Sequence, residues 1–231
     1  MRDEQTGSFW QQVTGSAISG PLKGASLELV RNDELSFGLW KSESPEGLVL
    51  APDPRFAGDY ETKDWEAHIG KLPVSPKLKS GPVAPRETVI GIALNGDVRA
   101  FPVAKIIQQS PLEDSVGGTP ILLVTGPDGV SIRAFVRRMP SESQPAEFFK
   151  PAAAPSGAPS QPASANAAAE KKTSAQEDWK LLDSATNSEW NFQGCATSGS
   201  AKGKCLEPVS FLKDYWFDWH NYHPNTSIYN H

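Results

Sequence analysis

With 231 residues, a net charge of −5 and a pI near 5.4, this chain lacks the basic field that favours binding to nucleic acids or anionic membranes. Its longest apolar stretch, residues 121–124, is far too short to span a bilayer. The length allows one large domain or two small ones, but 20 prolines and a hydrophobic fraction of 38% indicate that part of the chain is linker.

A segment at the N-terminus recurs near the C-terminus. The shared positions lie about 180 residues apart: Asp3, Thr6, Ser8 and Trp10 match Asp183, Thr186, Ser188 and Trp190. With one residue dropped, the match continues from 15–30 to 194–209, and Trp40 and Pro45 lie over Trp219 and Pro224. We call residues 3–45 the first copy and residues 183–224 the second copy. In each copy we expect a Gly-rich turn and then a short strand ending at Val30 or Val209.

Residues 51–86 form a proline-rich connector, with six prolines between positions 52 and 85. The same segment holds Phe56, Tyr60, Trp65 and Ile69. We therefore expect it to run over the surface with its aromatic side chains partly docked.

Residues 87–139 predict a hairpin, a helix and a second hairpin. Asn95-Gly96 is the strongest two-residue hairpin signal, because both residues tolerate the positive φ of a type I′ turn. The expected helix begins at Pro102, packs Val103, Ile106 and Ile107 on one side, and ends before Pro111. The other expected elements are strands at 88–94, 97–101, 121–124 and 130–136, with a turn at 125–129.

Residues 140–178 form an insertion rich in Ala, Pro and Ser. No Val, Ile, Leu or Met occurs in it, so it cannot bury enough apolar surface to offset the entropy of ordering. We expect this insertion to be disordered, and a passive spacer is favoured over an interaction tether because few aromatic or charged side chains are present.

Residues 179–231 contain the second copy and an aromatic segment. Leu212, Trp216 and Trp219 share one face of an expected helix, which Ser210 can cap and Pro224 ends. Phe37 and Trp40 repeat this spacing in the first copy, so a core-packing role is favoured over a ligand stack. As a candidate interaction face we select the aromatic side chains of this helix: Trp216, Phe217, Trp219 and Tyr222.

The cysteines and histidines offer only weak candidate sites. Cys195 and Cys205 replace Ser16 and Ser26 of the first copy and flank a Gly-rich turn. They could form a disulfide between facing strands or remain two free, buried thiols.

His220 and His223 lie three apart at a helix end and could supply two metal ligands, but no third ligand is evident. A solvated helix end is therefore favoured over a metal site.

Catalytic templates do not fit this sequence. Residues 199–204 superficially suggest a phosphate loop, but the glycines are too close together and Cys205 stands where Ser or Thr is required. No Gly-x-Ser-x-Gly elbow and no Cys/His constellation occurs, so we predict no catalytic residues and no cofactor.

The residues 87–102, the segment 114–120 and the Thr-x-Ser-x-Trp pattern in both copies resemble the bacterial domain of unknown function 3179 (DUF3179) family. The resemblance implies a β-rich α+β fold of short antiparallel strands, hairpins and a few short helices, with duplicated half-units. On this reading residues 1–50 are the C-terminal half of a first unit, 87–139 and 179–231 are the two halves of a second, and 140–178 is an insertion. Members resemble exported proteins, so a periplasmic or secreted location is weakly favoured, although no signal peptide is visible in this chain.

The chain departs from the family pattern where chemistry would be expected. Many members carry a Trp-His-Glu stretch and a Tyr-Cys-Pro-x-Cys stretch, and the corresponding residues here are 108–110 and 125–129, which contain no His and no Cys. Metal or thiol chemistry built on those residues therefore does not carry over.

Two functions remain open from the sequence. We favour a non-catalytic binding or structural module, with a protein partner or self-association through the incomplete first unit. The alternative is an enzyme or metal-binding protein whose site residues lie in a missing N-terminal unit.

Overall fold

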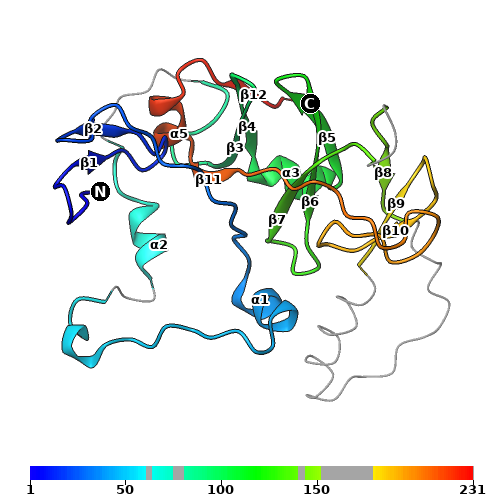
Figure 1. Ribbon diagram of the computed structural model, residues 1–231, viewed down its shortest axis with the longest axis horizontal. Coiled ribbons are helices and arrows are strands. Elements are labelled where there is room, and N and C mark those ends of the chain that lie inside the picture. The colour runs from blue at the N-terminus through cyan, green and yellow to red at the C-terminus, as the bar shows by residue number, and fades with distance from the viewer. Residues whose placement is uncertain (61–63, 75–80, 140–143, 152–178, 231) are drawn as a thin grey trace.

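The computed structural model describes residues 1–60, 64–74, 81–139, 144–151 and 179–230, and Figure 1 shows several small sheets joined by long connections. Short antiparallel strands dominate, with short helices between them, so the predicted β-rich α+β class is confirmed. None of the helices in the described part of the chain has the length and apolarity needed to cross a membrane.

A four-stranded sheet is built around the predicted Asn-Gly hairpin. Its order is β11-β3-β4-β12, and β12 runs parallel to β4. Asn95 and Gly96 have φ of 51° and 82°, so the type I′ expectation is confirmed. The strands are β3 (Thr88–Leu94), β4 (Asp97–Pro102), β11 (Leu212–Tyr215) and β12 (Ser227–Ile228).

Helix α3 (Val103–Gln109) follows β4 directly, as predicted, with Pro102 at its N-cap position. Only Ile106 of the expected apolar side is fully buried, whereas 42% of Ile107 is exposed. The helix ends before a cis Ser110-Pro111 bond, which leads into the next sheet.

A three-stranded sheet of order β5-β6-β7 packs beside the first one. Strand β6 (Thr119–Thr125) is buried on both faces, with Ile121 and Leu123 in one core cluster and Leu122 and Val124 in another, which explains its unbroken apolar run. Strand β7 (Ile132–Val136) pairs with it as expected. Strand β5 (Leu112–Val116) was not predicted, because only its two end residues, Leu112 and Val116, are apolar and buried.

The third sheet has the order β10-β9-β8, and it includes residues that were assigned to the insertion 140–178. Strand β8 (Phe148–Phe149) lies inside the insertion that was expected to be disordered, and it pairs with β9 (Leu181–Asp183), which pairs with β10 (Glu189–Trp190). Phe148 is buried against the Trp190 ring, with centroids 5.7 Å apart. The expectation of disorder is therefore wrong for residues 144–151, where one aromatic anchor is enough to add a strand. Residues 140–143 and 152–178 lie outside the described residues.

The first copy contributes β1 (Phe9–Trp10), β2 (Ala17–Ser19) and helix α1 (Phe37–Glu43), which Ser36 caps. The prediction of strands that end at Val30 and Val209 is wrong. Residues 27–30 form no strand, and residues 206–209 make only an isolated bridge between Pro208 and Phe135. Between β2 and α1 the chain runs down past β7 (Figure 1).

The helix expected from Ser210 begins later. Residues 212–215 form β11 on the edge of β3, and α5 (Trp216–Tyr222) follows. The aromatic spacing predicted the helix. It could not show that the residues expected to form its first turn pair instead with the edge of β3. Helices α1 and α5 end alike, since the N–H of Ser44 donates to the Trp40 carbonyl and that of His223 donates to the Trp219 carbonyl.

The connector holds a short 3-10 helix, η1 (Pro54–Phe56), and helix α2 (Trp65–Ile69). About half of Phe56 and Tyr60 and 43% of Trp65 are exposed, so the aromatic side chains of the described connector are only partly docked, as expected.

Candidate functional site

The predicted aromatic interaction face does not exist as one surface. Trp216 and Trp219 are buried against β3, while Phe217 is half-buried and Tyr222 is 40% exposed. Trp219 fits because Gly91 on β3 has no side chain: a Cβ there would lie 2.4 Å from the ring. Burial of the two tryptophans is the core role that their spacing predicted.

His220 and His223 pack on tryptophan rings. The His220 ring lies 4.9 Å from Trp216 and the His223 ring 4.1 Å from Trp219, centroid to centroid. Burial lowers the pKa of His223, which keeps its imidazole neutral near pH 7. Within the described ranges, no group of three or more His, Cys, Asp or Glu side chains could hold a metal ion.

The repeated polar residues form the same hydrogen-bonded cluster twice. In the first polar cluster (Asp3, Thr6, Ser8, Trp10), the Trp10 Nε1–H donates to Asp3 Oδ2 at 2.9 Å, and the Thr6 and Ser8 hydroxyls lie 2.7 Å apart. The second polar cluster (Asp183, Thr186, Ser188, Trp190) repeats these contacts at 2.9 and 2.8 Å. Both clusters tie a turn together, so their role is structural.

Each cluster supports a Gly-rich loop of equal shape. In the second copy this loop carries a disulfide between Cys195 and Cys205, whose Cα atoms are 4.0 Å apart across an antiparallel bridge. Ser16 and Ser26 form the equivalent bridge in the first copy. The cysteines therefore take a structural place in the fold.

Residues 108–110 and 125–129, which the sequence comparison singled out, meet in space. The Thr125 N–H donates to Ser110 Oγ at 2.8 Å, and the Tyr229 hydroxyl donates to Gln109 Oε1 at 2.7 Å. Chemical groups at these positions would be neighbours, which sequence spacing alone did not show. In this chain Ser110 and Gln109 supply a hydroxyl and an amide oxygen as hydrogen-bond acceptors, and Thr125 donates through its backbone N–H.

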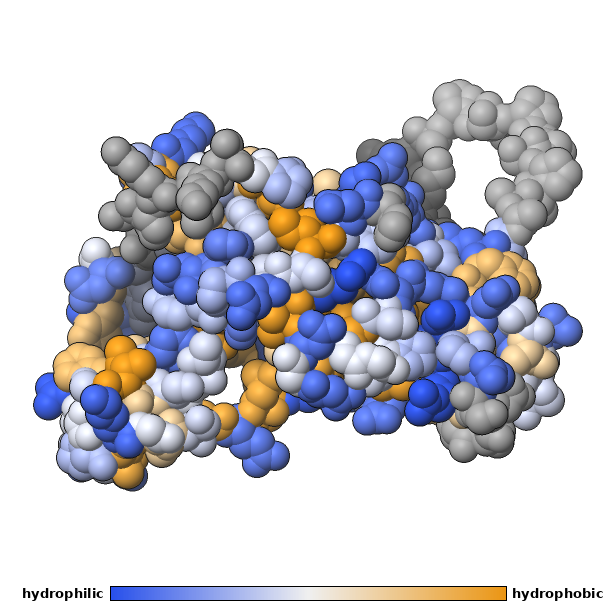
Figure 2. All heavy atoms as spheres, turned by 90° about the horizontal axis from the view of Figure 1, so that it is seen from above, coloured by the Kyte–Doolittle hydropathy of each residue, from blue (hydrophilic) through white to orange (hydrophobic). Residues whose placement is uncertain are grey.

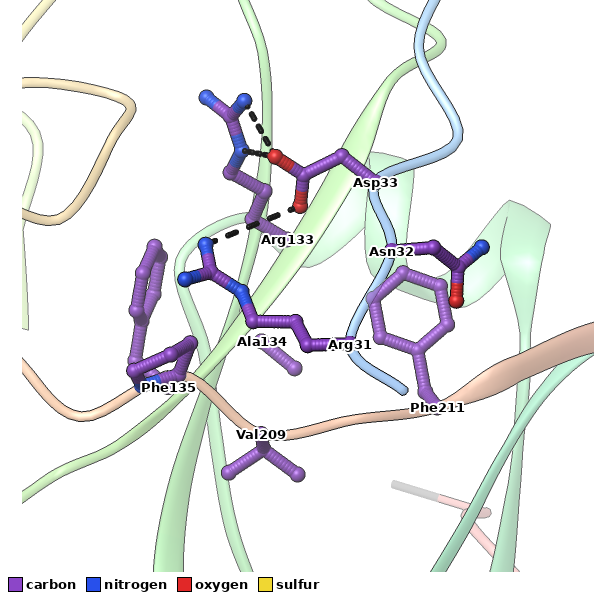
Figure 3. Close-up of a pocket in the computed structure, with 9 residues that line it drawn as sticks. Arg31, Asn32, Asp33, Arg133, Ala134, Phe135, Val209 and Phe211 are labelled. Carbon is purple, nitrogen blue, oxygen red and sulfur yellow. Dashed lines mark hydrogen bonds and ion pairs between the residues drawn. The ribbon is translucent and has the colours of Figure 1, made fainter. Parts of the chain in front are cut away.

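An ion cluster around the buried Arg133, which sequence reasoning missed, links the first copy to β7. Arg133 is 5% exposed, and its guanidinium contacts Asp33 at 2.7 Å (Figure 3). It also contacts Glu43 at 2.8 Å. Its other face lies over the Phe192 ring, 4.6 Å from the centroid. We call Asp33, Glu43 and Arg133 the clasp. The only signal in the sequence was a lone arginine in an otherwise apolar strand.

The two carboxylates of the clasp keep Arg133 charged. Burial alone would lower the pKa of Arg133, but the hydrogen bonds to Glu43 and Asp33 outweigh it, so the pKa is raised and the guanidinium stays charged. The cavity beside it in Figure 3 measures about 10 Å³, which is too small for any ligand larger than a water molecule. The clasp therefore anchors residues 31–43 and does not bind a substrate.

A larger groove lies between the two copies. It measures about 370 Å³ and we call it the inter-copy groove. The first copy lines it with Val13, Gly15, Leu27 and Leu29, and the opposite side consists of Gly91 and Ala93 of β3, residues 210–212, Trp219 and His223. Its walls are mainly apolar, which suits a hydrophobic ligand or side chain.

Next to this groove, equivalent residues of the two copies differ sharply in exposure. We call residues 27–30 the first-copy edge and residues 206–209 the second-copy edge. Leu27 is 54% and Val30 78% exposed, whereas Leu206 and Val209 are 4% and 6% exposed. Figure 2 shows apolar residues reaching the surface among hydrophilic ones on the face seen from above. The first-copy edge is thus an apolar segment without the cover that its counterpart has.

Comparisons with known proteins agree with the motifs. The family model described as "Protein of unknown function (DUF3179)" matches residues 1–226, a range that includes both copies and the segments between them. No curated protein and no solved structure matches the chain.

Proposed function

The chain belongs to the DUF3179 family, and from that premise we propose that it is a non-catalytic module that binds a protein partner in the inter-copy groove. One observation carries the proposal: the first-copy edge exposes Leu27, Leu29 and Val30 at 54%, 69% and 78%, although the same scaffold buries its counterpart. An exposed apolar segment beside a concave apolar groove is the usual form of a binding surface.

The chemistry of the described residues supports binding over catalysis. The stretch 108–110 supplies hydroxyl and amide groups, and the Asp128 carboxylate in the stretch 125–129 accepts hydrogen bonds from Val130 and Ser131. In the clasp, Asp33 and Glu43 both pair with the guanidinium of Arg133. A general acid or base needs a group with a free proton-transfer position in a cleft. The titratable side chains that line the inter-copy groove are His223, which packs on Trp219, and Glu28, which lies on the exposed first-copy edge.

The disulfide supports a periplasmic or secreted location. Bonds between cysteines persist in oxidising compartments and are rare in the cytosol. Since Cys195 and Cys205 are paired in the second copy, we place the proposed module outside the cytoplasm.

Binding of an apolar probe tests the groove. We expect the dye anilinonaphthalene sulfonate to bind the folded chain saturably. Leu29→Asp should lower the affinity for the dye about fivefold or more, because a carboxylate replaces an apolar side chain in the wall of the groove. Leu48→Asp is the matched control, since Leu48 is 94% exposed and lies outside the groove. Equal dye affinity in both variants would contradict the proposed site.

Metal analysis tests the non-catalytic part. The purified chain should carry far less than one equivalent of zinc, iron, copper or manganese per chain by mass spectrometry. A stoichiometric transition metal that survives dialysis would overturn the proposal in favour of a metal-dependent function.

A further inference from the structure

The covered second-copy edge shows what kind of segment this scaffold binds. The Val136 N–H donates to the Glu207 carbonyl at 2.7 Å, and the Val209 N–H donates to the Ala134 carbonyl at 2.8 Å. Phe135 and Pro208 face each other between these bonds in an antiparallel bridge. The second-copy edge therefore binds β7 as a short strand would, through backbone groups on alternate residues.

An aromatic side chain completes that contact. The Phe135 ring lies so close over Gly194 that a Cβ there would be 2.4 Å from it. Gly194 has φ of 79°, which leaves this face of the turn open to the ring. The binding element is thus an extended strand with an aromatic residue between its two backbone bonds.

The first copy presents the same frame without that strand. The Leu27 N–H donates to the Gly15 carbonyl at 2.9 Å, as the Leu206 N–H donates to the Gly194 carbonyl at 2.8 Å. Gly15 has φ of 66°, yet the three atoms nearest to a Cβ there all belong to Leu27 and lie 3.5 Å or more away. In the described part of the chain, no backbone hydrogen bond involves Glu28 or Val30.

The groove that Gly15 lines is large enough to hold an aromatic ring. Gly15 and Leu27 both line the inter-copy groove, whose volume of about 370 Å³ exceeds the cavity of about 150 Å³ that accepts benzene in an engineered protein. Val13 and Trp219 give this space apolar walls.

We propose that the first-copy edge binds an extended strand of another polypeptide, which places an aromatic side chain over Gly15 in the inter-copy groove. This inference rests on the proposed function and specifies its partner. The partner supplies one N–H to the Glu28 carbonyl and one carbonyl to the Val30 N–H, as β7 does in the second copy. Such strand addition gives affinity through the backbone and specificity through the side-chain pocket.

The occupant is a different protein and not a second copy of this chain. In every molecule of this protein, Val136 and Ala134 of β7 are already hydrogen-bonded to residues 207 and 209 of the same chain. A second molecule therefore has no uncovered β7 to offer.

A peptide with the sequence of residues 130–138 tests the proposal against the full chain. It carries β7 and its aromatic residue, and the same peptide with Phe135→Ala has identical charge. At about 150 mM salt, fluorescence anisotropy should show saturable one-to-one binding of the first peptide and at least about tenfold weaker binding of the second. Leu29→Asp in the chain should weaken binding at least about tenfold, while Leu48→Asp should leave it within about twofold.

The other outcomes separate the two proposals. Equal binding of both peptides, or equal loss in Leu29→Asp and Leu48→Asp, overturns the strand inference. Dye binding in the groove without peptide binding also overturns it but leaves the proposed function standing. Self-association that Leu29→Asp abolishes would identify a second copy as the occupant and overturn the choice of partner. Loss of both dye and peptide binding overturns both proposals.

Discussion

Asp3 and Asp183 make the same bonds in different surroundings. Each carboxylate accepts from a threonine backbone N–H, a threonine hydroxyl and a tryptophan Nε1–H. Asp183 is fully buried, whereas Asp3 is partly exposed. Desolvation would raise the pKa of Asp183, but its hydrogen bonds outweigh this and lower it, and the hydrogen bonds from Trp10 and Thr6 lower the pKa of Asp3 to about 2. Both carboxylates therefore stabilise the fold near neutral pH and lose that contribution as the pH falls below their ordinary value of 3.8.

Asp183→Asn should lower the free energy of unfolding by about 2 to 3 kcal/mol, because an amide nitrogen would face N–H donors in a buried site. Asp3→Asn, the matched change in the first copy, should cost clearly less because water can replace the lost bonds. Urea unfolding followed by tryptophan fluorescence measures both values. Equal losses would show that burial does not distinguish the two polar clusters.

Asp214 should show the opposite pH dependence. Burial, and then the nearby Asp218, raise the pKa of Asp214 to about 6. The unfolded chain therefore ionises first as the pH rises, and stability falls between about pH 4 and pH 6. Asp214→Asn keeps an oxygen for the Tyr215 N–H and should be about 1 kcal/mol more stable than the parent at pH 7.5, after allowance for solvent screening. Thermal unfolding across this range checks the sign, and an advantage that persists unchanged at pH 3.5 would refute ionisation as its cause.

At the scale of elements, glycine positions decide how α5 seats on the sheet. Gly91→Ala should cost about 2 kcal/mol or more, because the new methyl group would overlap the buried Trp219 ring. Gly38→Ala in α1 is the control: nothing lies within 4 Å of its Cβ position, so it should raise stability by up to about 1 kcal/mol. Chemical denaturation of both variants gives the comparison. A neutral Gly91→Ala would mean that α5 packs differently.

The disulfide is the chief difference between two otherwise equal loops. The double variant Cys195→Ser and Cys205→Ser recreates the serine pair of the first copy and should fold, with stability reduced by about 2 to 3 kcal/mol for a closed loop of this length. Thiol titration of the denatured parent should find no free thiol before reduction and two after it. Two free thiols in protein recovered from an oxidising compartment would exclude the bond.

At the scale of the molecule, the clasp is one of the contacts that hold the first copy against β7. Arg133→Met would leave Asp33 and Glu43 without their partner, so residues 31–43 should detach locally. Hydrogen exchange of the α1 amides should accelerate at least about tenfold, while β3 and β4 stay protected. Arg31→Met is the control, since its guanidinium lies 4.0 Å from Asp33 and is half exposed. Unchanged exchange in Arg133→Met would show that other contacts hold the first copy.

Local signals in the chain were sufficient for some elements and insufficient for others. The β3–β4 hairpin and α3 were predictable because turn residues and apolar spacing act within a few residues. Strand β5 pairs with β6 across the short turn Gly117-Gly118 and was missed because only its two end residues are apolar and buried. Strand β8 was missed, and β11 was taken for the start of a helix, because each exists through a neighbouring strand that is distant in sequence. The prediction of an aromatic interaction face was wrong for the same reason. Trp219 packs on Gly91, which is distant in sequence and which helical spacing cannot reveal.

By itself the sequence determined family membership. It also determined the two polar clusters, because their aspartate, threonine, serine and tryptophan side chains bond to each other within eight residues of chain. Only the tertiary structure decided which copy is covered. Arg133 meets Asp33 across 100 residues of sequence, and β7 pairs with residues 207 and 209 but not with residues 28 and 30. The two edges thus differ in exposure, because β7 pairs with β6 on one side and has only one other side on which to pair.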